Sequence, residues 1–279
     1  MRNLLSANFS RLFKDKFLWV ACFTCFIMSF WITISGSQSA NASIAQGRVE
    51  YAEEYLFSAV PLLGLFLAAC ISMFLGTEYS DGTIRNKLAV GKTRYGVYFA
   101  GYLTCFAASL FVMLSWALGA SAFFLESQVP LERGFLGILE TLLILVGIMA
   151  SYAAIFTLIG TLCTNKALTM VLALSVYLIL IMAASGLHDR LRFPELTGGM
   201  TVTANWEFIE KPMEPNPLYL SGMVREVCQS ILELLPSGQA SLVNANDVIH
   251  PVRQLCFSAV VTVLTLAGGM AAFRKKDLK

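Results

Sequence analysis

The chain has 279 residues, of which 57% are hydrophobic and only 14% are charged. Soluble domains carry about 25% charged residues, so this composition argues against a soluble globular protein. The formal net charge of +2 is too small to predict binding to nucleic acid. The seven cysteines are odd in number and lie mostly in apolar runs, which argues against a disulfide framework.

Six continuous apolar runs are long enough to cross a bilayer, which requires about 20 residues of helix per span. Continuous rather than alternating hydrophobicity predicts helices and not the strands of a membrane barrel. We therefore predict an all-α membrane protein with six transmembrane helices, forming a single domain over residues 1–279. The predicted spans are residues 17–34, 56–75, 97–125, 135–163, 167–187 and 255–273. Pro61 and Gly64 in the second span predict a kink or a thin packing face.

Lysine and arginine gather in one set of segments, and cytoplasmic segments of membrane proteins carry an excess of these residues. The two ends of the chain, the loop at residues 76–96 and the link after the fourth span hold 13 basic and 4 acidic residues, a net of +9. The other connecting segments hold 7 basic and 13 acidic residues, a net of −6. We expect both termini and the 76–96 loop in the cytoplasm, and residues 188–252 outside it.

Residues 1–16 form an amphipathic pattern before the first span. One helical face is apolar and the opposite one is polar: Leu5, Phe9, Leu12 and Phe13 against Asn3, Ser10, Arg11 and Lys14. A helix of this kind lies in the membrane interface. The alternative is a plain cytoplasmic extension of the first span.

The 188–252 region contains a second amphipathic pattern. Asn216 and Pro217 fit an N-cap and a first-turn proline, and Pro236 with Gly238 fits the end of the helix. Apolar residues recur between them at helical spacing: Leu220, Met223, Val224, Val227, Ile231 and Leu235. We predict an amphipathic outer helix here, which packs on the spans or dips into the outer leaflet. The residues before it, 187–216, are predicted to be a loop.

The loop between the second and third spans carries the pattern of a short helix. Ser80 can cap it and Asp81 suits its positive end. Ile84 and Leu88 lie one turn apart and form a small apolar face, and Thr93 can cap the third span. From the residues alone, this helix either docks a soluble partner or belongs to an ordinary surface loop whose basic residues hold anionic headgroups.

Gly91-Lys92-Thr93 has the form of the end of a phosphate-binding loop. That motif requires a glycine five residues before Gly91, and position 86 is Asn86. We therefore expect no ATP site in this chain.

Two segments resemble those of type-2 ABC exporter permeases, the membrane subunits of bacterial ATP-binding-cassette transporters. Glu78-x-x-x-Gly82-Thr83-Ile84 followed by Lys92-Thr93-Arg94 resembles their inner loop, and residues 273–279 resemble their C-terminal tail. The layout also matches, with an N-terminal interfacial helix, six spans and an enlarged outer region before the last span. At about 64 residues, residues 188–251 are longer than a re-entrant hairpin needs, which leaves the substrate class open.

This resemblance implies that the 76–96 loop is the coupling element that docks on a separate ATPase subunit. The residues implied are Glu78, Ser80, Asp81, Gly82, Thr83, Ile84, Arg85 and Leu88. It implies an exporter in a bacterial cytoplasmic membrane, with ATP and Mg²⁺ on the partner chain and no cofactor, metal or catalytic residue here. A second copy or a sibling permease would complete a central path lined by the first, second and fifth spans. The apolar spans suggest a hydrophobic or amphipathic cargo, such as a peptide antibiotic, a toxin or a lipid-like molecule.

Two other classes of function stay open. A non-transporting sensor or immunity subunit would bind a ligand through the outer region. An intramembrane lipid-modifying enzyme would need clustered acids or histidines at the membrane face, where the loop offers only Glu78 and Asp81. Glu140 is the one ionisable residue within a predicted span and is a functional candidate for that reason. It lies near the outer end of the span, so the alternative is that its carboxylate reaches the interface.

Overall fold

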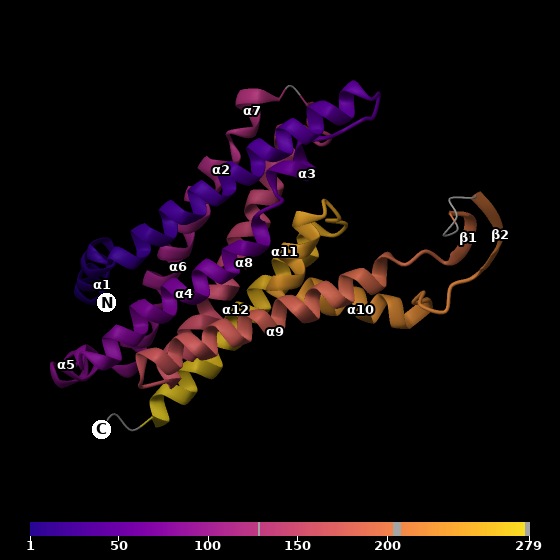
Figure 1. Cartoon of the computed structure of the whole chain (residues 1–279). Coiled ribbons are helices and arrows are strands. Elements are labelled where there is room, and N and C mark those ends of the chain that lie inside the picture. The colour runs from indigo at the N-terminus through magenta and orange to yellow at the C-terminus, as the bar shows by residue number, and fades with distance from the viewer. Residues whose placement is uncertain (128, 203–207, 277–279) are drawn as a thin grey trace.

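Six long helices in the described residues form the body of the protein (Figure 1), and each overlaps one of the six predicted spans, although the first runs on to Ala45. The computed structural model describes residues 1–127, 129–202 and 208–276. Each long helix is apolar enough to cross a membrane, so the chain is a helical, multi-pass membrane protein. These helices are α2 (Lys16–Ala45), α4 (Val60–Ser80), α6 (Arg94–Ala120), α8 (Gly134–Leu162), α9 (Lys166–Arg192) and α12 (Pro251–Lys275).

Helix α4 lies at the centre of the bundle and packs against α2, α6, α8 and α9. Pro61 lies in its first turn, where a proline is compatible with a straight helix. Gly64 provides the thin face, because a Cβ atom there would lie only 2.4 Å from Cε2 of Tyr177 on α9. The Tyr177 hydroxyl donates to the carbonyl of Pro61 at 2.5 Å. The close packing face is therefore confirmed, and the predicted span 56–75 is also interrupted by a turn at residues 57–59, directly before α4 begins.

The short elements divide between the two ends of the bundle (Figure 1). Helices α1 (Arg2–Lys14) and α5 (Thr83–Ala89) lie at one end with the last turn of α12, and we call this the α5 end. Helices α3 (Ala52–Leu56) and α7 (Phe123–Glu126) lie at the opposite end, called the α7 end. The N-terminus and the end of α12 are therefore on the same side of the bundle as α5.

The predicted loop at residues 187–216 is wrong as a description of this region. Helix α9 continues to Arg192, and two antiparallel strands follow, β1 (Leu196–Val202) and β2 (Phe208–Pro215). The described side chains at 196–198 and 212–215 are exposed. Where the described part of the ribbon is exposed, no alternation of apolar and polar residues is needed, so periodicity gave no sign of it.

The outer amphipathic helix exists as α10 (Gly222–Leu234), but its predicted ends are wrong. Asn216 and Pro217 lie in a turn, where the Asn216 side chain accepts from the amide of Leu218 at 3.0 Å. The helix begins after Ser221 instead. Pro236 does not end the structure but opens a further helix, α11 (Pro236–Asn244), because a first-turn proline starts a helix as readily as it follows one.

Helix α11 is buried from its first residue to Val243 and packs against α4, α8 and α9. Helix α10 differs, because its apolar face is exposed. The exposed residues are Met223, Val224, Val227, Ile231 and Leu234. The region between α9 and α12 therefore places one helix inside the bundle and leaves a second with an apolar face free for lipid or protein.

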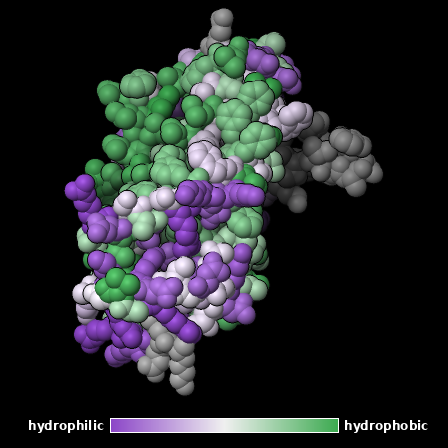
Figure 2. All heavy atoms as spheres, turned by 90° about the vertical axis from the view of Figure 1, so that its left-hand side faces the viewer, coloured by the Kyte–Doolittle hydropathy of each residue, from purple (hydrophilic) through white to green (hydrophobic). Residues whose placement is uncertain are grey.

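The surface divides into a polar and an apolar part. Figure 2 looks at the left-hand side of Figure 1 and shows hydrophilic residues gathered in the lower half, where Figure 1 places α5 and the end of α12. Apolar residues cover the upper part of this view, toward which α2 extends. Exposed apolar side chains of α2 include Trp19, Phe23 and Trp31, as expected of a helix that faces lipid.

Candidate functional site

The loop at residues 76–96 folds as a tight turn followed by the short helix α5. Ser80 is the last residue of α4 and is not a cap, contrary to the prediction. Gly82 holds the N-cap position in a left-handed conformation, with φ of 65°. Asp81 lies before it and is not in the first turn of α5. The sequence prediction was wrong because α4 continues beyond the apolar run and displaces the helix start by two residues.

The predicted apolar face of α5 is confirmed. Ile84 is buried against Leu4 of α1, Val97 and Tyr98 of α6, and Phe273 of α12. Leu88 packs against the same cluster and is partly buried. Thr93 caps α6 as predicted, because its side chain accepts from the amide of Gly96 at 3.1 Å. Helix α5 thus packs against α6 and α4 and shares one apolar cluster with α1 and α12.

A buried carboxylate, that of Glu78 near the end of α4, joins three helices. Its residue is only 3% exposed. The Arg11 guanidinium of α1 and the Lys87 ammonium of α5 both lie 2.6 Å from its Oε1 atom. Lys87 also donates to the side chain of Asn8 in α1 at 2.8 Å. Because two cations from two other helices share one oxygen, α1, α4 and α5 are linked electrostatically away from full solvent screening.

Arg11 is held on α4 by more than the ion pair. It donates to the carbonyl of Phe74 and to the hydroxyl of Thr77, and its guanidinium lies 4.3 Å from the centre of the Phe74 ring. A guanidinium over an aromatic face is stabilised by the ring quadrupole. The residue therefore fixes the angle between α1 and α4 through several interactions of different kinds.

The inward face of α1 agrees with the predicted apolar face in part. Leu12 is buried and Leu5 and Phe9 are partly buried, as predicted, but Phe13 is exposed and Leu4 and Asn8 are buried as well. Arg11, which the pattern assigned to the polar face, turns toward α4 instead. The prediction treated every charged side chain as directed to solvent and could not see a partner carboxylate that is 67 residues away along the chain.

The end of α12 is bound to the same end of the bundle. Arg94 donates to the carbonyls of Phe273, Arg274 and Lys276. Lys276 donates to the carbonyl of Thr161 at 2.6 Å, which caps the end of α8 with a positive charge. Burial lowers the pKa of Lys276 below its usual value of 10.5. The C-terminal segment is therefore a fixed part of the α5 end.

The predicted loop residues separate into two groups. Glu78, Thr83, Ile84 and Leu88 face the protein, and Thr83 donates to the carbonyl of Glu78 at 3.0 Å. Ser80, Asp81 and Arg85 are exposed, with Asn86 and Val90 beside them. Val90 is an apolar side chain with 78% of its surface accessible. The first group can hold α5 in place, and only the second can touch a soluble partner.

Glu140 is not brought to the α5 end. It lies on α8 and is exposed, and none of the described residues forms an ion pair with it. The exposed position agrees with a carboxylate that reaches the interface rather than one buried among the spans.

Sequence reasoning missed two buried carboxylates near the α7 end. Glu53 accepts from the amides of Glu132 and Arg133 at 3.0 Å each, at the start of α8. Glu233 of α10 is fully buried and pairs with Arg253 of α12. Neither residue lies inside a predicted span. Only an ionisable residue within a span was singled out from the sequence, because burying a charge in the membrane is costly. Their only sign in the sequence was a position at the edge of an apolar pattern.

In the described part of the chain, no group of three or more His, Cys, Asp or Glu side chains is arranged to hold a metal ion.

The α5 end consists of a short packed helix, a buried charge network and an exposed polar face. The chain matches no model of a known protein family and no curated protein.

Proposed function

We propose that the chain is the membrane subunit of an ATP-driven exporter whose ATPase is a separate protein. The observation that carries this proposal is the attachment of α5 to α1 and α4 through Glu78, Arg11 and Lys87. A short helix that is exposed on one side and fixed on the other to several spans is suited to transmitting motion. The resemblance of the 76–96 loop to the coupling loop of type-2 ABC exporter permeases supports the same function.

The proposal places the α5 end in the cytoplasm. The basic residues of both termini and of the 76–96 loop support this orientation through the positive-inside tendency. The α7 end and the strands are then extracytoplasmic, in a bacterial cytoplasmic membrane. The exposed residues Asp81, Arg85 and Val90 would contact the ATPase. ATP and Mg²⁺ would be bound by that ATPase subunit and not by this chain.

The proposed mechanism uses α5 as a rigid lever. Closure of the ATPase pair on ATP would press on the exposed face of α5. Since Glu78 ties α5 to α4 and α1, these helices would move together and re-expose a path between two permease copies. Six spans enclose little space alone, so a second copy or a sibling permease completes the path. The cargo is proposed to be hydrophobic or amphipathic.

The first experiment is affinity purification of the full chain from its native membrane in mild detergent, with mass spectrometry of the associated proteins. We expect an ATPase subunit with a phosphate-binding loop in equal copy number. Its absence, together with ligand binding or lipid turnover by the purified chain alone, would replace this proposal with a sensor subunit or a lipid-modifying enzyme.

Two charge variants of α5 then separate docking from transmission. Arg85→Glu changes the exposed face and is expected to reduce ATPase recovery at least tenfold. Lys87→Met removes a cation from Glu78 and is expected to retain the ATPase while substrate-stimulated hydrolysis is lost. Equal recovery of the ATPase by Arg85→Glu and the unchanged chain would show that α5 is not the docking element.

A further inference from the structure

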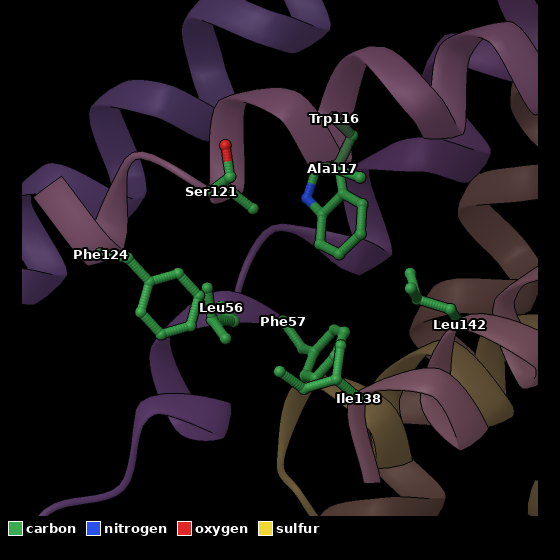
Figure 3. Close-up of a pocket in the computed structure, with 9 residues that line it drawn as sticks. Leu56, Phe57, Trp116, Ala117, Ser121, Phe124, Ile138 and Leu142 are labelled. Carbon is green, nitrogen blue, oxygen red and sulfur yellow. The ribbon is translucent and has the colours of Figure 1, made fainter. Parts of the chain in front are cut away.

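A cavity of about 440 Å³ lies between α10 and the start of α12, and we call it the α10–α12 cavity. All but one of its lining residues have polar or charged side chains: Arg225, Glu226, Gln229, Ser230, His250 and Arg253. Figure 3 shows a smaller cavity, of about 140 Å³ near the α7 end, which is lined mostly by apolar side chains such as Phe57 and Leu142. No charged side chain lines the smaller cavity, so of the two only the α10–α12 cavity can select a ligand by its charge.

One wall of the α10–α12 cavity presents a guanidinium that is held in place. Arg253 of α12 pairs through Nε with the buried carboxylate of Glu233, and its Nη2 atom lies 3.2 Å from Nδ1 of His250. The Arg253 side chain is still 37% exposed, and none of the described hydrogen bonds uses its Nη1 atom. Because a guanidinium has several N–H donors in a fixed plane, Arg253 can bind a phosphate oxygen without leaving Glu233.

The opposite wall belongs to α10 and carries charges of both signs. Glu226 is exposed and forms no ion pair among the described residues. Arg225 supplies a second positive charge, and its guanidinium is anchored on the carbonyl of Leu191 at 2.9 Å. The two arginines are balanced by Glu226 and by Glu233 behind Arg253. A cavity with charges of both signs and little net charge is complementary to a zwitterion rather than to an anion.

The α10–α12 cavity lies where the apolar run of the last span begins. Arg253 comes two residues before that run, which starts at Leu255. Phe257, Val260 and Leu264 follow Arg253 at helical spacing, so they lie on the same face of α12. Val260 and Leu264 are 47% and 67% exposed. The cavity is therefore at the level of the lipid headgroups and continues into an exposed apolar stripe, as binding of a phospholipid requires.

We propose that the α10–α12 cavity binds the headgroup of a zwitterionic phospholipid with a primary ammonium group, as in phosphatidylethanolamine. The phosphate accepts from Arg253, and the ammonium donates to Glu226. One acyl chain lies along Phe257, Val260 and Leu264 of α12. The site uses no residue of the Glu78 network, and its occupancy requires neither an ATPase nor a cargo.

The test compares three phospholipids with identical acyl chains. The full chain is purified in detergent, delipidated and titrated with phosphatidylethanolamine, phosphatidylcholine or phosphatidylglycerol, and native mass spectrometry measures the affinity for the first bound lipid. Phosphatidylcholine keeps the phosphate and the positive charge but has no N–H donor, and phosphatidylglycerol has no cation. We expect phosphatidylethanolamine to bind about fivefold more tightly than either, which is the gain from one partly exposed charge pair.

Two exposed carboxylates provide matched variants. Glu226→Gln removes the proposed partner of the ammonium group and is expected to abolish the preference for phosphatidylethanolamine. Glu140→Gln removes an exposed carboxylate of α8 that lies outside the cavity, and it is expected to retain the preference.

A filling substitution tests the cavity itself. Ser230→Phe places bulk in the lining and is expected to weaken the binding of all three lipids. Val227→Phe adds bulk on the exposed apolar face of the same helix and is expected to leave their affinities unchanged. If Ser230→Phe does not fold, the comparison of lipids in the unchanged chain still decides.

Equal affinities for phosphatidylethanolamine and phosphatidylcholine would overturn the proposal. So would a preference for phosphatidylethanolamine that survives in Glu226→Gln. Glycerophosphoethanolamine carries the same headgroup without acyl chains and is expected not to displace the lipid at equal concentration. Displacement under that condition would assign the cavity to a soluble zwitterion instead of a bilayer lipid.

Discussion

Two buried carboxylates, Glu78 at the α5 end and Glu233 near the α7 end, are neutralised by similar chemistry in different settings. Glu78 of the long helix α4 accepts from Arg11 of α1 and Lys87 of α5, which are both short helices. Glu233 accepts from Arg253 of α12 and from Gln229, one turn before it in its own helix. The backbone carbonyl of Glu233 also accepts from Gln239 of α11.

The difference lies in what each carboxylate joins. Around Glu233, helices α10 and α11 are consecutive and α11 is buried among the spans, so the ion pair secures a fixed corner. Around Glu78, helices α1 and α5 lie at the periphery, and α5 is bounded by Gly82 and Gly91, both at positive φ. The same type of interaction thus fixes one region internally and attaches a separate unit in the other. We infer that charge pairing serves stability at Glu233 and transmission at Glu78.

The largest expected effect is the loss of coupling on replacement of Glu78, which tests whether Glu78 and Glu233 have different roles. Glu78→Gln leaves the charges of Arg11 and Lys87 without their buried counter-ion, and substrate-stimulated ATPase activity is expected to fall at least tenfold. Both cations are partly exposed, so the loss of stability is expected to be only about 2 kcal/mol. Glu233→Gln is the matched control, expected to destabilise by a similar amount but to retain coupling. Thermal unfolding in detergent and ATPase assays in vesicles measure the two quantities, and equal loss of coupling in both variants would remove the distinction.

A smaller effect concerns pH. Burial raises the pKa of Glu233, but hydrogen bonds from Arg253, Gln229 and His250 together with the charge of Arg253 outweigh it, so the net pKa is lowered from 4.5. Because the folded-state pKa lies below the unfolded one, this stabilisation is present above pH 4.5 and is lost as the pH falls below it. The melting temperature of the unchanged chain is expected to decrease more steeply than that of Glu233→Gln between pH 5 and about pH 3. Parallel curves would show that the carboxylate contributes nothing to stability.

The smallest expected effect is on hydrogen exchange in α5, and it tests whether α5 opens as a separate unit. A Cβ atom at Gly82 would meet nothing within 4 Å, so Gly82→Ala acts only through its φ of 65°. The strain of about 1 kcal/mol is expected to raise hydrogen exchange of the α5 amides about fivefold. Gly82→Asn is expected to do so less, because asparagine tolerates this conformation. Gly47→Ala is equally strained and unobstructed at the other end, and it should leave α5 exchange unchanged.

The six spans could be predicted from the sequence because bilayer thickness imposes a length on every apolar run. The small apolar face of α5 was also predictable, since Ile84 and Leu88 are one turn apart in the chain. The orientation of Arg11 was not, because its direction depends on Glu78 in a distant helix. Helix α11 was missed for a related reason: its residues are of mixed polarity, and its buried Gln239 has hydrogen-bond partners on α10 and α12, which are separate segments of the chain.

The indole N–H of Trp116 on α6 is buried without an acceptor among the described residues, and this could not be predicted from the sequence. Whether a donor is satisfied depends on the atoms around it, whereas periodicity shows only on which face of a helix a residue lies. Glu140 shows the reverse case. The sequence drew attention to it by its position in an apolar run, and the structure places it at the surface.

The cluster beneath α5 joins segments that are far apart in the chain. It contains Leu4 of α1 and Phe273 of α12. Ile84 therefore lacks part of its apolar surroundings until α12 is in place and its end is bound by Arg94. If a partner docks on α5 as proposed, it would meet the helix in this position only after α12 has packed.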